Sequence, residues 1–169
     1  AETVRGSGAA LLGIIDEIVR STRRQIEEKE QVLTVEIPEG LPKVWGDRTR
    51  LVQVLTNLLS NAYKYTLNKG QITIQVGAAT NQWDPGGSPN VVRVAVIDTG
   101  IGLKPEDQKH IFTKFFRSED VKAREAPGTG LGLNITKSLV EMQGGKIWFE
   151  SEFRKGTTFY FTIPVAETA

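Results

Sequence analysis

The sequence predicts an α+β fold, a two-layer sandwich with helices on one face of a mixed, mostly antiparallel sheet. Stretches with the 3.6-residue period of a helix are separated by shorter stretches that alternate as strands do. Successive strands are close enough to be joined as hairpins, which argues against a doubly wound parallel sheet. With 39% hydrophobic residues, a chain of 169 residues can fill one core.

The predicted helices are residues 9–30, 48–66, 105–112 and 131–143. The first carries an apolar face that needs a partner, either its own domain or a second helix of a dimerising pair. Asp47 is placed to cap the second, and Pro105 suits the first turn of the third. Gly144-Gly145 ends the last.

The predicted strands are residues 33–37, 71–79, 91–97, 146–151 and 157–163. A polar loop rich in Gly and Pro, residues 81–90, joins the second and third as an unusually long hairpin tip. Residues 117–127 have few apolar side chains and no clear period, which predicts a loop.

Composition excludes several classes of function. Lys and Arg number 21 against 20 Asp and Glu, a net charge of +1, so we expect no nucleic-acid binding and no membrane contact. There is no cysteine, which excludes a disulfide scaffold and favours a reducing compartment such as the cytoplasm. No apolar run approaches the roughly 20 residues of a membrane span, although a longer parent protein could still be membrane-anchored.

Polar side chains line one edge of the predicted helix 48–66. Asn57, Asn61, Lys64 and Tyr65 lie at i, i+4, i+7 and i+8, beside the apolar stripe. Amide oxygens can bind Mg²⁺, an ammonium group attracts phosphate, and an aromatic ring can stack on a base. The same residues could instead form an ordinary solvated helix face.

Two glycine-rich segments follow buried or mobile stretches. Asp98-Thr99-Gly100-Ile101-Gly102 comes directly after a predicted strand, where a carboxylate could accept from the amino group of adenine or could simply stabilise a turn. Gly128-Thr129-Gly130-Leu131-Gly132 opens the predicted helix 131–143, and its amides suit phosphate. It is neither a dinucleotide fingerprint nor a Walker loop. Between them, we expect the aromatics of 112–117 to anchor the base of the loop rather than to stack on a nucleotide base, and Arg117 is a candidate phosphate contact.

Together these segments resemble the ATP-binding domain shared by histidine kinases, DNA gyrase B subunits, mismatch-repair ATPases and ninety-kilodalton heat-shock chaperones. The resemblance covers residues 33–164. Residues 57–65 look like the N box of that family, 98–102 its first glycine box, 112–117 its F box and 128–132 its second glycine box. The resemblance implies a Bergerat-type ATP-binding fold.

The resemblance also implies roles for these residues. Asn61 would hold Mg²⁺ with Asn57 assisting, Lys64 and Arg117 would contact phosphates, and Tyr65 would flank adenine. Asp98 would accept from the adenine amino group. The nucleotide-binding set would be Asn61, Lys64, Tyr65, Asp98, Gly100, Ile101, Gly102, Gly128, Thr129, Gly130, Leu131, Gly132 and Thr157, the last acting through water. Residues 104–127 would form a lid over ATP.

Position 57 indicates the branch of the superfamily. The gyrase-like hydrolases carry a glutamate there, and an amide cannot take a proton from attacking water as a carboxylate does. A histidine kinase needs no such base, because its nucleophile is a histidine on another domain. The resemblance therefore implies a kinase domain that uses ATP and Mg²⁺, with residues 31–169 as the catalytic domain and 1–30 as a preceding helix, possibly the stub of the dimerisation helix.

The one histidine, His110, does not resemble the phosphoacceptor motif of these kinases, so we interpret it as structural. The expected partners are a histidine-bearing dimerisation domain of the same parent protein and a response regulator receiver domain. We expect a homodimeric parent and a monomeric chain. Two alternatives stay open: a non-catalytic nucleotide-sensing module, and a serine kinase of the anti-sigma-factor type.

Overall fold

The computed structural model describes residues 3–5, 8–112 and 130–166. Within these residues the main sheet has five strands in the order β2-β4-β5-β7-β6. The strands are β2 (Val32–Glu36), β4 (Gln71–Thr80), β5 (Asn90–Asp98), β6 (Ile147–Glu152) and β7 (Gly156–Pro164). The β2-β4 pair is parallel and the other pairs are antiparallel. The predicted mixed, mostly antiparallel sheet is confirmed.

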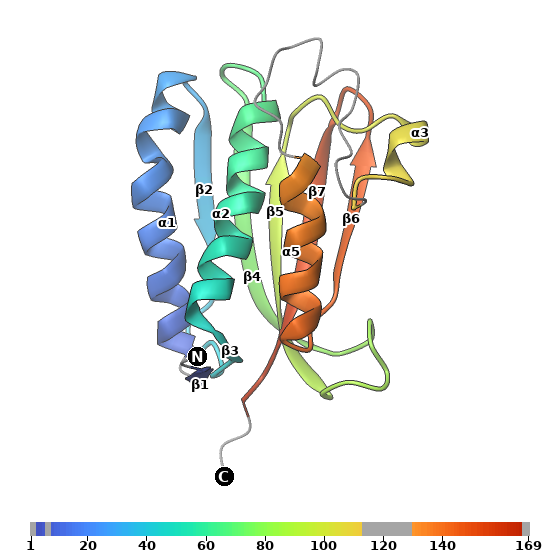
Figure 1. Ribbon diagram of the computed structural model, residues 1–169. Helices are drawn as coiled ribbons and strands as arrows, with labels where there is room; N and C mark the ends of the chain where they lie inside the picture. The colour runs from blue at the N-terminus through green and yellow to red at the C-terminus, as the bar shows by residue number, and fades with distance from the viewer. Residues whose placement is uncertain (1–2, 6–7, 113–129, 167–169) are drawn as a thin grey trace.

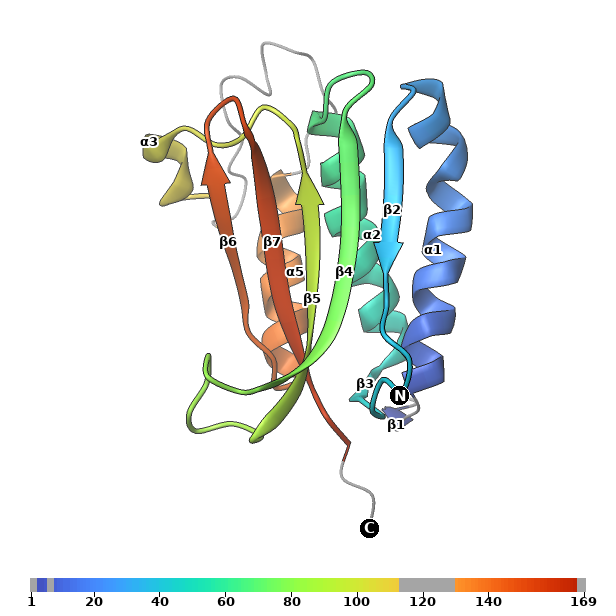
Figure 2. The same ribbon diagram turned by 180° about the vertical axis from the view of Figure 1, so that it is seen from behind.

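The helices α1 (Gly8–Glu28), α2 (Arg48–Tyr65) and α5 (Gly130–Met142) cover one face of this sheet, as Figures 1 and 2 show. Side chains from both layers form the core between them, among them Leu11, Ile14, Leu51, Leu58, Ile72, Val94 and Phe161. The apolar face of α1 therefore packs within this core and against α2. The division of the chain at residue 30 stays a prediction.

A second, two-stranded sheet was not predicted. It pairs β1 (Thr3–Arg5) with β3 (Trp45–Asp47) in antiparallel register, next to the start of α2 (Figure 1). Strands of three residues are too short to display the alternation that identifies a strand in sequence.

Helix α2 begins, and helix α5 ends, with the capping residues that the sequence predicts. The Asp47 carboxylate accepts from the backbone N–H of Arg50 at 3.1 Å and so caps α2. At the end of α5, Gly144 has φ +84°, and the N–H groups of Gly144 and Gly145 donate to the carbonyls of Glu141 and Val140. This pattern is a Schellman motif, in which glycine is favoured at the left-handed position.

The helix predicted at 105–112 is shorter than expected. α3 spans only Pro105–Gln108, beside β6 (Figure 1). The N–H of His110 donates to the carbonyl of Asp107, three residues back, so the chain continues in turns. The Gln108 side chain donates to the carbonyls of Leu103 and Ser151, and these two hydrogen bonds hold the segment against the end of β6.

The long tip of the β4-β5 hairpin lies at the lower end of the sheet in Figure 2 and turns toward β6. Trp83 of this tip stacks on Trp148 of β6, with ring centroids 5.0 Å apart, and Trp148 stacks on Tyr160 of β7 at 5.3 Å. The Arg93 guanidinium lies 5.1 Å from the centre of the Tyr160 ring. The stacking of Trp83 on Trp148 therefore holds the tip on the sheet, and the cation–π contact joins β5 to β7 beneath the stacked rings.

Replacing Asp47 by alanine should lower the free energy of unfolding by about 1 kcal/mol, because the first turn of α2 loses its side-chain acceptor. Chemical denaturation measures this change. Asp47→Asn keeps a side-chain oxygen at the cap and should stay close to the original stability. Equal loss in both variants would show that the carboxylate charge, and not the cap, stabilises the helix.

Candidate functional site

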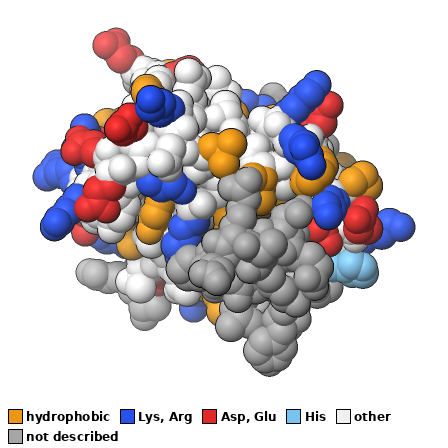
Figure 3. All heavy atoms as spheres, turned by 90° about the horizontal axis from the view of Figure 1, so that it is seen from above, with side chains coloured by type: hydrophobic (Ala, Val, Ile, Leu, Met, Phe, Trp, Pro, Cys, Tyr) orange, Lys and Arg blue, Asp and Glu red, His pale blue; other side chains and the backbone are white. Residues whose placement is uncertain are grey.

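Those predicted site residues that the structure describes come together at one end of the molecule. α2 and β5 both end there, and α5 begins there (Figure 1). Figure 3 looks onto this end, where Lys and Arg side chains occur together with Asp and Glu around the rim. The topology thus brings three segments that are far apart in sequence to one place.

The last two turns of α2 supply the polar edge that the sequence predicts. Asn61 is only 6% exposed, and its side chain has no hydrogen-bond partner among the described residues. Asn57, one turn earlier, donates from Nδ2 to Oγ1 of Thr136 on α5 at 3.0 Å. Lys64 and Tyr65 are half-buried at the end of the helix. The amide of a largely buried side chain that makes no hydrogen bond within the described residues is free to meet a ligand or water, so Asn61 has the features of a binding group.

The loop after β5 packs directly on the end of α2. The N–H of Ile101 donates to the carbonyl of Tyr65 at 3.2 Å. A Cβ atom at Gly100 would lie 2.5 Å from the Tyr65 carbonyl oxygen and 2.8 Å from Oδ1 of Asp98. A side chain at position 100 would clash with both groups, so only glycine allows the loop to lie this close to the end of α2. Asp98 is thereby held beside Tyr65.

Asp98 ends β5 with one carboxylate oxygen held and the other available. Its Oδ1 accepts from the N–H groups of Gly100 at 2.8 Å and Thr157 at 3.3 Å. Its Oδ2 accepts from none of the described residues. Burial raises the pKa of this carboxyl to about 6, against the opposing effect of those two N–H donors. An acceptor fixed in this way is suited to one incoming donor.

Thr157 lies opposite Asp98 in the β5-β7 ladder and is buried. Its hydroxyl is 2.8 Å from that of Ser151, which also accepts from the N–H of Leu103 at 2.8 Å. Ser151 therefore connects Thr157 to the segment after Gly102. The left-handed Gly102, φ +69°, sits against the carbonyl of Glu152, which leaves no room for a side chain.

Sequence reasoning missed Ser151 and Thr136. Ser151 stands in an alternating strand, where a small polar residue gives no signal. Thr136 is fully buried in an otherwise apolar helix face, and a buried polar residue of this kind is the signal that could have identified it.

Part of the predicted site lies outside the described residues, namely Arg117, Gly128 and Thr129 and most of the predicted lid 104–127. Gly130, Leu131 and Gly132 are the first residues of α5, as predicted. The backbone N–H groups of a first turn have no partner within the helix, so this end of α5 suits an anion.

A cation at this end would depend on amide oxygens. The described residues contain no cluster of three His, Cys, Asp or Glu side chains able to hold a metal ion. Asn61 has an amide oxygen without a partner in this part of the chain. Mg²⁺ commonly takes one or two protein oxygens and completes its shell with water and substrate phosphates, so the residues present fit that ion.

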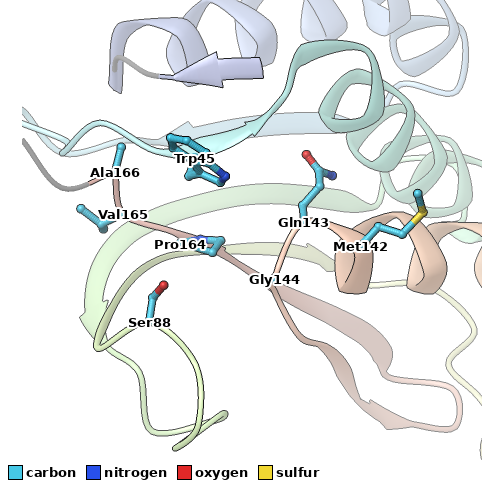
Figure 4. Close-up of a pocket in the computed structure, with 8 residues that line it drawn as sticks. All are labelled: Trp45, Ser88, Met142, Gln143, Gly144, Pro164, Val165 and Ala166. Carbon is cyan, nitrogen blue, oxygen red and sulfur yellow. The ribbon is translucent and has the colours of Figure 1, made fainter. Parts of the chain in front are cut away.

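A hollow of about 520 Å³ lies at the opposite end of the molecule (Figure 4). Trp45, Met142 and Gln143 line part of it. Gln143 accepts from the N–H of Asp47 at 2.7 Å and so joins the end of α5 to the start of α2. None of the predicted site residues borders this hollow.

In the described parts of the chain, no helix is long and apolar enough to span a bilayer.

Comparison with known proteins identifies the family. Residues 46–167 match the family described as histidine kinase-, DNA gyrase B- and HSP90-like ATPase. The adaptive-response sensory kinase SasA of Synechococcus sp. (strain CC9902) is 41% identical over 133 residues, which are 79% of this chain and 32% of SasA. The chain thus spans about a third of the length of that relative.

Two solved structures are similar over most of the chain. The nucleotide-free catalytic domain of histidine kinase ThkA is 31% identical with a TM-score of 0.76, over 98% of this chain and 99% of that domain. ThkA in complex with the response regulator protein TrrA is 32% identical with a TM-score of 0.69, over 92% of this chain and 40% of that one.

The chain therefore belongs to the family of histidine kinase-, DNA gyrase B- and HSP90-like ATPases. Its likeness to the whole ThkA catalytic domain places it among the histidine-kinase catalytic domains of that family. The resemblance inferred from the four sequence segments is confirmed at the level of the family and the fold.

Asp98→Asn should stabilise the fold at high pH. Because the folded-state pKa of Asp98, about 6, lies above the ordinary 3.8, the native state binds the proton more tightly, and stability falls as pH rises between these values. Asparagine keeps the oxygen that accepts from Gly100 but carries no charge. Thermal melting should show a higher Tm for the variant at pH 8 and little difference near pH 4. A gap that does not change with pH would refute the buried charge as its cause.

Proposed function

We propose that this chain binds Mg-ATP and donates its γ-phosphoryl group to a histidine on a separate dimerisation domain, for later transfer to a response regulator. The observation that carries the proposal is the Asp98 carboxylate, with Oδ1 held by two backbone N–H groups and Oδ2 without a partner among the described residues. Adenine presents an exocyclic amino group that such an oxygen can accept from.

The remaining residues would surround the nucleotide. Tyr65 would flank the base. Its carbonyl accepts a hydrogen bond from the N–H of Ile101, which keeps Tyr65 next to the loop that follows Asp98. Gly100, Ile101 and Gly102 provide close backbone approach, and the Thr157 hydroxyl reaches the base through water. These assignments rest on the family resemblance together with the observed neighbourhood of the residues.

The phosphates would lie between α2 and the start of α5. Lys64 and Arg117 would provide positive charge, and the N–H groups of residues 128–132 would bind the anion. Asn61, assisted by the oxygen of Asn57, would hold the Mg²⁺ that neutralises charge on the phosphates. Phosphoryl transfer needs little covalent help from the protein, so positioning and charge neutralisation are the expected contribution of these residues.

Transfer would move the γ-phosphorus from the β-γ bridging oxygen of ATP to a ring nitrogen of the acceptor histidine, releasing ADP. Asn57 supports this reaction over hydrolysis. It is an amide that donates to Thr136, and no carboxylate stands at that position to take a proton from water. A dimerisation domain and a receiver domain are the proposed partners, and the ThkA complex with a response regulator supports the second of them. We propose a cytoplasmic location on the absence of cysteine.

Calorimetric titration with a non-hydrolysable ATP analogue, with and without Mg²⁺, tests the nucleotide site. Asp98→Asn should weaken binding by at least about tenfold, because the amino group of adenine then meets an amide donor. In Asn61→Ala the dependence of affinity on Mg²⁺ should be lost. Asp47→Asn makes the same chemical change at the far end of α2 and should leave affinity unchanged. No binding by the folded wild-type chain would refute the site.

A phosphotransfer assay separates the three candidate functions. The chain is mixed with labelled ATP and a purified histidine-bearing dimerisation domain. Acid-labile phosphate on that domain is the expected result for a histidine kinase. Acid-stable phosphate on a protein substrate would favour the serine-kinase alternative, and tight nucleotide binding with no transfer would favour a nucleotide-sensing module.

A further inference from the structure

The backbone carbonyls in the last turn of α2 accept hydrogen bonds from two sides. On one side, the Tyr65 carbonyl accepts from Ile101 in the loop after β5. On the other side stand two side chains from the turn between α1 and β2, Lys29 and Gln31, which sequence analysis did not single out. This second set of contacts lies outside the residues assigned to the nucleotide.

Lys29 and Gln31 bind the carbonyls that end α2. The Lys29 ammonium donates to the carbonyl of Tyr63 at 2.7 Å and to that of Lys64 at 3.2 Å. The Gln31 amide donates to the carbonyls of Tyr63 at 3.0 Å and Thr66 at 2.9 Å. Carbonyls in the last turn of a helix lack partners within the helix, and a cation there also opposes the negative end of the helix dipole.

The turn that carries these two side chains is itself well defined. Glu30 adopts a left-handed conformation, φ 54°. The N–H of Glu30 donates to the carbonyl of Glu27, and the N–H of Gln31 donates to that of Ile26, which together form a Schellman motif at the end of α1. Lys29 and Gln31 flank the left-handed residue. Gln31 is buried, only 6% exposed, and Lys29 is half-buried, so both side chains are packed in place.

We propose that Lys29 and Gln31 are positioning residues for the nucleotide site. They hold the final turn of α2, and with it the side chains of Lys64 and Tyr65, against the loop that follows Asp98. This inference rests on the proposed function of that site. It assigns to the end of α1 a part in nucleotide binding, although the helix itself stands on the far side of α2.

The test is nucleotide affinity in variants that remove the donors without removing bulk. Lys29→Met and Gln31→Met should each weaken binding of the non-hydrolysable ATP analogue by about tenfold, the size of coupling expected when a supporting network is loosened. Lys29→Arg can still donate to the same carbonyls and should restore most of the affinity. Arg23→Met removes a positive charge from an exposed position of α1 and should change little.

A double-mutant cycle distinguishes positioning from general support of the fold. If Lys29 acts through the last turn of α2, Lys29→Met should have a clearly smaller effect in a Lys64→Met background. Equal effects in both backgrounds, or unchanged affinity in folded Lys29→Met and Gln31→Met, would overturn the inference while leaving the proposed function intact. Failure of the wild-type chain to bind would overturn both. If Lys29→Met does not fold, the same cycle is run with Gln31→Met.

Discussion

The backbone contact between the end of α2 and the loop after β5 is the constraint on which the site depends. The Tyr65 carbonyl meets the N–H of Ile101, and Gly100 lies so close that a Cβ atom would touch both that carbonyl and Asp98. A helix end and a strand end usually leave backbone groups for water. Here the backbone groups of the two segments hydrogen-bond to each other. The position of the polar edge of α2 relative to Asp98 is therefore set by a main-chain contact and not by side-chain packing.

Local rules predicted most of the elements correctly. The cap at Asp47, the stop at Gly144 and the stripe of α2 each follow from residues within one or two turns of one another. The same is true of the hairpins, whose strands alternate visibly. The segments proposed for the site were also recognisable in the sequence, because their residues are grouped in short stretches at the ends of elements.

What the sequence could not predict depends on partners far away in the chain. The bond from Asn57 to Thr136 joins residues 79 positions apart, and the role of Ser151 depends on Leu103 and Thr157 at once. The short strands β1 and β3 owe their conformation to each other. The segment after Pro105 is held in part by the Gln108 side chain, which donates to the carbonyl of Ser151 on β6, a contact that no local propensity reports.

The position of β5 has a consequence for how the protein opens. Val94 and Val96 are buried under the helices, and Ala95, on the other face of the same strand, is also fully buried. On that face Arg93 reaches both the Tyr160 ring and the Gln75 side chain, and the stacked rings continue to Trp83. A strand covered on both faces and paired at both edges exchanges its amide hydrogens only when the whole domain unfolds. The strand that ends in Asp98 would therefore be the last to lose its structure, so the carboxylate proposed to meet adenine keeps its place through the local openings that occur elsewhere in the domain.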